Sequence, residues 1–132
     1  MNMKIVNIER VAAVILLLLL ILGLSVPDAP AQQRSEQRCG WFSNPTPANA
    51  WLTDKDGEWI ISTQGSYSAE GDWPNFSPSR WIKTNINYGY GCACMKVVTE
   101  RNEMRVTRIL SAASRPVSVC RRDKAISKKE PK

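Results

Sequence analysis

The sequence contains no histidine among its 132 residues. This excludes serine or cysteine nucleophiles activated by histidine, histidine metal ligands and histidine pH switches. The Cys-x-x-Cys spacing of redox pairs and the paired knuckles of structural zinc sites are also absent. We therefore predict no catalytic set, no metal site and no cofactor, and we expect a non-enzymatic protein.

Long apolar runs are equally scarce, because only residues 11–24 form one. This run is shorter than the roughly 20 residues that span a bilayer and suits the core of a signal peptide. Lys4 and Arg10 precede it, and Ala29-Pro30-Ala31 follows with the small-x-small pattern of a cleavage site. We expect a helical signal peptide over residues 1–31, cleaved after Ala31, so that membrane contact is transient. An uncleaved membrane anchor is the alternative.

Acidic residues are in the minority, and the formal net charge is +6. Residues 39–123 hold 10 basic and 8 acidic side chains, whereas residues 124–132 hold four lysines and one glutamate. Because a nucleic-acid binder carries its charge on the folded surface, we predict no nucleic-acid partner. We expect residues 32–38 to be a flexible leader and residues 124–132 a disordered Lys-rich tail. Contact of this tail with anionic lipid or cell-wall polymer is the alternative.

The chain has four cysteines, Cys39, Cys92, Cys94 and Cys120. An even number in a small exported chain predicts two disulfides. Cys92 and Cys94 are two residues apart in a predicted strand, so their side chains point to one face. A bond between these two would close a very small ring. We therefore expect Cys39 to pair with one of them and Cys120 with the other, and the sequence leaves open which.

Short strands joined by turns are predicted between residues 39 and 123. Residues 49–53 and 58–63 flank an Asp-Lys-Asp-Gly turn, which indicates a hairpin. A second hairpin is predicted over residues 92–110, with further strands over residues 81–86 and 117–120. Residues 65–80 read as a long loop. The expected fold is one mainly β domain over residues 39–123, barrel-like or sandwich-like, with five or six strands.

All five tryptophans lie between residues 41 and 81. Tryptophan fills cores first, but exposed aromatic side chains also anchor protein partners or stack on sugars. Trp73, in a Gly- and Pro-containing loop, is the favoured binding aromatic, and Trp41 and Tyr67 are further candidates. An envelope hydrolase, a third possible function, would use the carboxylates of Glu58, Glu70 and Asp72.

A series of short motifs runs along residues 38–123. In order, these are Arg38-Cys39-Gly40-Trp41-Phe42, Asn44-Pro45-Thr46-Pro47, Asn49-Ala50-Trp51-Leu52, Gly57-Glu58-Trp59, Gly71-Asp72-Trp73, Tyr88-Gly89-Tyr90-Gly91-Cys92-Ala93-Cys94 and Cys120-Arg121-Arg122-Asp123. The series resembles a family of short exported proteobacterial proteins classed as a domain of unknown function. The resemblance implies a Gram-negative periplasmic or secreted protein, and it supplies no catalytic or ligand residues.

These observations together predict an exported, disulfide-stabilised, non-enzymatic module. We expect it to bind a protein partner in the cell envelope, as small inhibitor or immunity proteins do. A module that binds cell-wall glycan is the alternative, followed by a carboxylate-based envelope hydrolase.

Overall fold

The computed structural model describes residues 34–132. The signal peptide expected over residues 1–31, with its cleavage after Ala31, lies outside the described residues. Within residues 34–132 no helix is long and apolar enough to cross a membrane.

The described chain is mainly β, as the sequence predicts. Its seven strands are β1 (Ser35–Asn44), β2 (Ala50–Thr53), β3 (Glu58–Thr63), β4 (Tyr67–Ser68), β5 (Ile82–Asn85), β6 (Tyr88–Glu100) and β7 (Arg105–Arg115). One short helix follows, α2 (Val117–Arg122), and there are three 3-10 turns, η1 (Pro78–Arg80), η2 (Arg101–Glu103) and η3 (Ser127–Lys129). The strands exceed the expected five or six because the two-residue β4 forms inside the predicted loop over residues 65–80.

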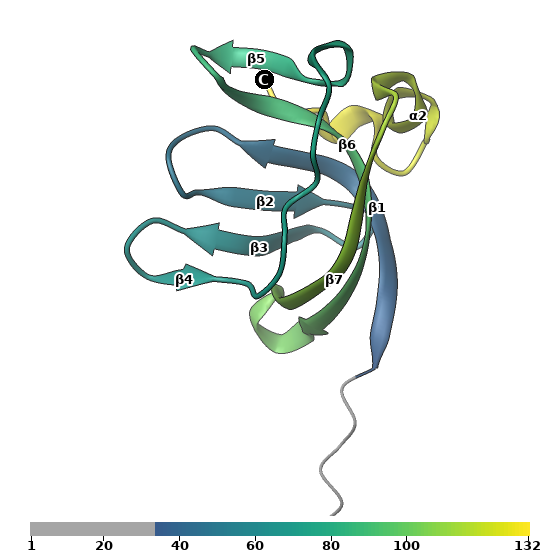
Figure 1. The fold of residues 1–132 in the computed structure, drawn as a ribbon. Helices are drawn as coiled ribbons and strands as arrows, with labels where there is room; N and C mark the ends of the chain where they lie inside the picture. Colours follow the sequence, from purple (N-terminus) through teal and green to yellow (C-terminus); the bar gives the residue numbers. More distant parts are fainter. Residues whose placement is uncertain (1–33) are drawn as a thin grey trace, which may run out of the picture. The chain divides into compact units, whose positions relative to one another are not determined.

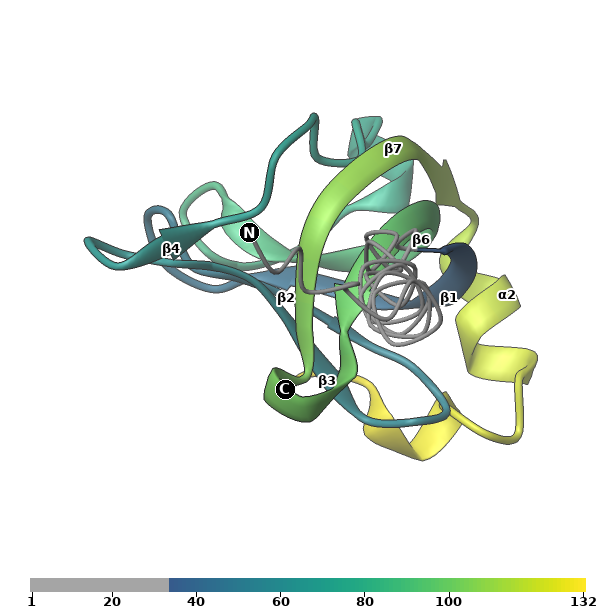
Figure 2. The same ribbon diagram turned by 90° about the horizontal axis from the view of Figure 1, so that it is seen from below.

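Five of these strands close into a barrel. The sheet order is β1-β2-β3-β7-β6-β5, and β1 also pairs with β6, which joins the two ends of the path β1-β2-β3-β7-β6. The pairings are antiparallel except between β3 and β7, which meet in parallel at Ile60 and Arg105. Figures 1 and 2 show the five strands curving around a common interior. This circuit is the arrangement of the small OB-type Greek-key barrels.

Alternation along the strands separates an inner face from an outer face. In β1, Phe42 points into the barrel, whereas Cys39 and Trp41 belong to the opposite face. The inner face holds the main core, whose largest side chains are Phe42, Leu52, Trp59, Ile61, Met95, Val97 and Val106. Both predicted hairpins are confirmed, and β7 extends to Arg115 instead of ending near Leu110 because its ladder with β6 continues to Cys92.

Residues 35–38 belong to strand β1, which corrects this part of the flexible leader expected over residues 32–38. β1 pairs with β6 from Ser35 opposite Val98 to Asn44 opposite Gly89. Residues 35–38 therefore have a complete ladder, although their side chains are polar. The Arg38 side chain is buried at 4% exposure because Asp54 neutralises its charge.

The C-terminal residues are also ordered, which corrects the disordered tail expected over residues 124–132. The strand expected at residues 117–120 is instead the helix α2. Pro116 precedes this helix with a φ of −54°, which suits a helix start. Residues 117–132, which we call the C-terminal segment, pack on the outer face of β1 and β6. There Ile126 and Cys120 join Trp41, Tyr90 and Cys92 in a second buried cluster. Figure 2 shows α2 beside β1, outside the ring of strands.

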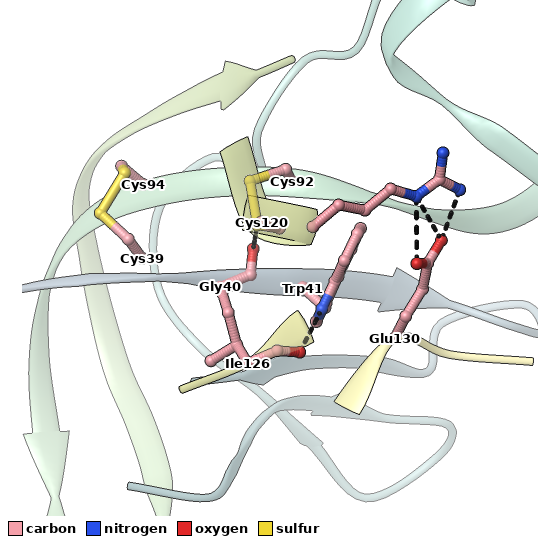
Figure 3. The surroundings of a disulfide bond; sticks show 9 residues. Cys39, Gly40, Trp41, Cys92, Cys94, Cys120, Ile126 and Glu130 are labelled. Atoms are coloured by element: carbon pink, nitrogen blue, oxygen red, sulfur yellow. Dashed lines mark hydrogen bonds and ion pairs between the residues drawn. A yellow bond between two sulfur atoms is a disulfide. The ribbon is translucent and has the colours of Figure 1, made fainter. Parts of the chain in front are cut away.

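Two disulfides lie on the outer face. As predicted, Cys39 pairs with one cysteine of β6 and Cys120 with the other. Cys39 bonds to Cys94 between the neighbouring strands β1 and β6, and Cys92 bonds to Cys120 of α2. Figure 3 shows the two bonds and the cluster around Trp41. Their presence indicates an oxidising environment of the extracellular type.

Candidate aromatic binding site

The connection from β4 to β5 brings four aromatic rings together. It first follows β7, because the amide of Ile109 donates to the carbonyl oxygen of Glu70 at 2.7 Å. Gly71 then turns with a φ of +96°, and a side chain there would strike the carbonyl oxygen of Ile109. Next, the ring of Phe76 lies against Gly91 of β6, at the place that a Cβ atom would need. Phe76 can therefore occupy this position only because residue 91 is a glycine.

The four rings form a tilted cluster around Phe42. The ring centroids of Trp73 and Phe76 each lie 5.7 Å from that of Phe42, and the centroid of Trp81 lies 6.5 Å away. Phe76 and Trp81 are 4.9 Å apart. Phe42 is 2% exposed, whereas the other three side chains are only partly buried. The cluster therefore presents ring surface to solvent above a buried floor.

These rings line a pocket of about 370 Å³, which we call the aromatic pocket. Its lining residues are Phe42, Asn44, Trp73, Pro74, Phe76, Pro78, Trp81, Lys83 and Asn87. No carboxylate belongs to this lining, and Lys83 makes no ion pair within residues 34–132. The pocket is thus mainly apolar, and its lining carries one positive charge.

Ile86 stands in the turn next to this pocket. It is 79% exposed and has a φ of +50°, in the left-handed region that β-branched residues rarely adopt. The next residue, Asn87, lines the pocket, and its carbonyl oxygen accepts a hydrogen bond from the Trp81 indole at 3.1 Å. Strain of this kind costs on the order of 1–3 kcal/mol and tends to persist at functional positions. The β5–β6 turn therefore carries an exposed apolar side chain next in sequence to a residue of the pocket lining.

The structure brings Trp73 and Tyr67 together but places Trp41 elsewhere. Trp73 also borders a second groove of about 430 Å³, which includes Tyr67 and the hydroxyl side chains of Ser62, Thr63, Ser66 and Ser68. The Tyr67 hydroxyl donates to the carbonyl oxygen of Val106 at 2.7 Å, and burial raises the pKa of this tyrosine. Trp41 is 0% exposed, and its indole donates to the carbonyl oxygen of Ile126. Trp41 as a binding aromatic is therefore wrong, because the C-terminal segment covers it.

Phe42, Phe76 and Trp81 are pocket residues that the sequence analysis did not single out. The available signal is the stretch from Trp73 to Pro78, in which two aromatic residues alternate with two prolines. Proline fixes φ and has no N–H donor, so such a segment is disfavoured within a sheet and belongs to a connecting loop, where its rings lie near the surface. The contribution of Phe42 has no such signal, since it depends on the pairing of distant strands.

A cluster of charged side chains lines a third pocket, of about 400 Å³, on another part of the barrel. Arg38 donates to the carboxylates of Asp54 at 2.5 Å and Asp56 at 2.9 Å, and its guanidinium lies 3.8 Å from the ring centroid of Trp59. Asp54 also accepts from the Trp59 indole and from the amides of Asp56 and Gly57. These bonds hold the β2–β3 turn against β1, so we assign this network a structural role.

Two carboxylates of this cluster have lowered pKa values. Hydrogen bonds from Lys55 and then Arg38 lower the pKa of Asp56 to about 2. Partial burial raises the pKa of Glu36, but hydrogen bonds from Thr99 and Arg38 outweigh it and lower the pKa overall. Both groups therefore favour the charged form in the folded protein.

The three carboxylates of the hydrolase alternative lie at the surface. Glu70 pairs with Arg108 at 2.8 Å, and Glu58 and Asp72 are exposed. None of the three lines any of the pockets described above. Residues 34–132 also contain no group of three or more side chains that could hold a metal ion.

Comparison with known proteins agrees with the resemblance seen in the motifs. No curated protein and no solved structure matches the chain. One family model does match, over residues 33–127, and it describes a protein of unknown function, DUF4087. The match spans both disulfides, the aromatic pocket and the buried part of the C-terminal segment. The chain therefore belongs to the DUF4087 family.

Proposed function

We propose that the protein is an exported, non-enzymatic module that binds a protein partner of the cell envelope through the aromatic pocket. The observation that carries this proposal is the ring surface that Trp73, Phe76 and Trp81 leave accessible around Phe42. Well-packed apolar pockets of this kind receive the anchor side chains that dominate protein–protein binding energy. The partner would insert an apolar or aromatic side chain between these rings.

The positive charge of the pocket lining defines the partner further. Lys83 is exposed and unpaired within the described chain, and no lining residue is acidic. A carboxylate that flanks the inserted side chain would therefore meet a complementary charge. Ile86, exposed on the neighbouring turn, supplies a second apolar contact.

The rigidity of the scaffold supports a binding role. The two disulfides attach β6 to β1 and to α2, and β6 also carries Gly91, on which Phe76 rests. A pocket held in place before binding loses less conformational entropy when the partner arrives. The same two bonds support export to an oxidising compartment, for which the Gram-negative periplasm or the cell exterior is our proposal.

A glycan partner is a second candidate because of the groove on the other side of Trp73. There the indole and Tyr67 border three hydroxyl side chains that are not buried, those of Thr63, Ser66 and Ser68, a combination that suits stacking on a sugar ring with hydrogen bonds to its hydroxyls. Some OB-type barrels also bind oligosaccharides, although a fold alone does not establish a function. The aromatic pocket favours a protein side chain more, since its rings are tilted by 35–61° from one another and form no flat platform.

The test is capture of envelope proteins on the purified, oxidised protein, with variants that change only the pocket. We expect a partner that is retained by the unmodified protein and lost with Trp73→Ala and with Lys83→Glu. Lys96→Glu is the matched control, because it makes the same charge change outside the pocket lining. Calorimetry with the purified partner should then show at least tenfold weaker binding for both pocket variants.

Binding that is indifferent to Trp73 and Lys83 would overturn the aromatic pocket as the binding site. Retention on purified cell-wall sacculi, lost with Trp73→Ala and Tyr67→Ala but not with Lys83→Glu, would replace the protein partner with a glycan. Release of soluble fragments from those sacculi would show enzymatic activity and contradict the non-enzymatic assignment.

A further inference from the structure

We propose that the sulfur of Cys39 is a thiol-exchange site, where an external dithiol reduces the Cys39–Cys94 bond while the barrel stays folded. The second disulfide, Cys92–Cys120, is protected from the same reagent. The inference is independent of the aromatic pocket, because no residue lines both sites.

The first argument is accessibility. Cys39 is exposed and Cys94 is half-buried, whereas Cys92 and Cys120 are 1% and 2% exposed. Cys39 also lines the charged pocket of about 400 Å³, so an incoming thiol has space to approach it. Figure 3 shows the Cys39–Cys94 bond away from the cluster of Trp41 and Ile126 that surrounds Cys120.

The second argument is that the barrel has other means of holding these strands together. Cys39 and Cys94 are directly opposite each other in a ladder of ten paired positions between β1 and β6. β6 is also paired with β7 along most of its length, and β1 is paired with β2. Opening this bond therefore removes one of many links between the two strands. Opening Cys92–Cys120 would instead remove the disulfide that cross-links α2 to β6, and α2 would stay joined to the barrel covalently through the chain at Pro116 alone.

The third argument is the position of Lys96. It follows Cys94 by two residues in β6, so both side chains belong to the outer face, and Lys96 is exposed. A nearby positive charge stabilises a thiolate, and a stabilised thiolate leaves more readily in exchange reactions. Cys94 is therefore suited as the leaving group when Cys39 is attacked.

The exchange proceeds in two balanced steps. A thiolate of the dithiol attacks the sulfur of Cys39, a mixed disulfide forms, and the sulfur of Cys94 leaves as a thiolate that takes a proton from water. The second thiol of the reductant, as a thiolate, then attacks the reductant's other sulfur in the mixed disulfide, which closes the reductant's own disulfide and releases Cys39 as a thiol. Two electrons and two protons pass from the dithiol to the cysteine pair. The expected biological partner is a protein with a Cys-x-x-Cys dithiol.

Timed reduction with dithiothreitol under native conditions tests the proposal. Samples of the oxidised protein are quenched with iodoacetamide, and the labelled cysteines are identified by mass spectrometry. We expect Cys39 and Cys94 to be labelled at least ten times faster than Cys92 and Cys120, with an unchanged near-ultraviolet circular dichroism spectrum. Equal labelling of all four cysteines, or labelling only after unfolding by urea, would overturn the proposal.

Two sets of variants separate exchange at this site from general loosening of the fold. Lys96→Gln should slow reduction of the Cys39–Cys94 bond several-fold, whereas Lys128→Gln, the same change at an exposed lysine that lines neither pocket, should leave the rate unchanged. Cys94→Ser should leave a Cys39 thiol that reacts at once with oxidised glutathione. Cys120→Ser should leave a Cys92 thiol that reacts slowly or only in urea. A Cys39 thiol as unreactive as that of Cys92 would also contradict the inference.

Discussion

Arg38 shows at the scale of one residue how a polar segment becomes part of a folded barrel. Its guanidinium is buried between the carboxylates of Asp54 and Asp56 and the ring of Trp59. A buried charge is tolerated only when its partners satisfy it, and the loss of one partner leaves the other uncompensated. The ion pair between Arg38 and Asp54 therefore has unequal consequences, depending on whether one or both members are removed.

We expect Arg38→Ala to lower the free energy of unfolding by about 3–5 kcal/mol, because Asp54 would remain buried without its counter-charge. Urea unfolding followed by circular dichroism measures this loss. Lys55→Ala is the control, since Lys55 is 72% exposed and its removal should change stability by less than about 0.5 kcal/mol. A loss as small as that of the control would mean that Arg38 is not buried as described.

The outcome for Arg38→Met with Asp54→Asn should differ from that of either single variant. Removing both charges leaves no unpaired ion, so the double variant should be more stable than the sum of the single losses predicts. A double-mutant cycle in urea provides this comparison. Strictly additive losses would show that the two side chains do not interact.

At the scale of elements, the C-terminal segment functions as a cover for the outer face of β1 and β6. Ile126 buries its side chain against Trp41, and Glu130 accepts from both Arg121 at 2.6 Å and Tyr90 at 2.9 Å. The Lys129 ammonium donates to the carbonyl oxygens of Asp54 and Lys55 in the β2–β3 turn. The Cys92–Cys120 bond, the buried Ile126 side chain and a few polar contacts thus hold a segment that is otherwise rich in lysine.

Ile126→Ala should lower the free energy of unfolding by about 2 kcal/mol or more, as large-to-small changes at buried isoleucines do. It should also shift the tryptophan fluorescence toward longer wavelengths, because Trp41 becomes hydrated. Lys128→Ala, in the same segment but exposed, should change neither quantity. Equal behaviour of the two variants would place the segment away from Trp41.

The connection between β4 and β5 depends on a single glycine of β6. A Cβ atom at residue 91 would lie 2.5 Å from the ring of Phe76. Gly91→Ala should therefore displace Phe76, open the aromatic pocket and weaken partner binding at least as much as Trp73→Ala does, while the disulfides remain formed. Binding assays with a mass measurement of the oxidised protein test this, and unchanged affinity would contradict the assigned packing.

The elements that could be predicted from the sequence are those with local signals. The two hairpins follow from alternating apolar residues around turn residues. The cysteine spacing disfavours a bond between Cys92 and Cys94, but only the structure shows that Cys39 pairs with Cys94 and Cys120 with Cys92. The order of residues 35–38 and of the C-terminal segment had no local signal, because Arg38 depends on Asp54 and Ile126 depends on Trp41. In α2, Val117 and Val119 favour a strand by propensity, but the bond from Cys120 to Cys92 and the preceding proline outweigh this weak preference.

The candidate site was predictable to a similar degree. Trp73 was expected at the surface because glycine and proline surround it. Which rings accompany it depends on the contact of Phe76 with Gly91 and on the seating of Phe42 in the barrel. Trp41 has a sequence environment much like that of other surface candidates, and only the tertiary contact with Ile126 buries it.

At the scale of the whole molecule, several carboxylates make stability depend on pH. The pKa values of Glu36 and Glu130 are lowered, and that of Asp56 is about 2, so all three are charged in the folded protein at a pH where the unfolded chain begins to bind protons. Their contribution is complete above the unfolded pKa of about 4 and is lost as the pH falls below it. The urea midpoint should be constant between about pH 6 and pH 5 and then decrease steadily toward about pH 2.

A variant with Glu36→Gln and Glu130→Gln should be less stable at neutral pH and should show a shallower decrease on acidification. Urea titrations at each pH give the dependence of the urea midpoint on pH for the variant and for the unmodified protein. A midpoint that rises on acidification would mean that these carboxylates are not stabilised in the charged form.

The two disulfides differ in what they hold together. In the chain-entropy account, the 28-residue separation of Cys92 and Cys120 corresponds to about 3.6 kcal/mol. Cys92→Ala with Cys120→Ala should therefore lower the free energy of unfolding by about 3–4 kcal/mol. It should also increase amide hydrogen exchange in α2 before the rest of the chain. Uniform exchange across the barrel and α2 would show that this bond does not secure the segment selectively.

The contact of Trp41 with Ile126 joins residues 85 positions apart in the chain. A ribosome or translocation channel delivers Trp41 long before Ile126, and β1 likewise precedes its partner β6 by about fifty residues. Folds in which most contacts are remote in sequence form slowly, because large loops must close first. The barrel can therefore close only after β6 has emerged, and Trp41 can be buried only after the last few residues have emerged. A nascent chain shortened by ten residues would lack Ile126 and would leave Trp41 uncovered on the outer face.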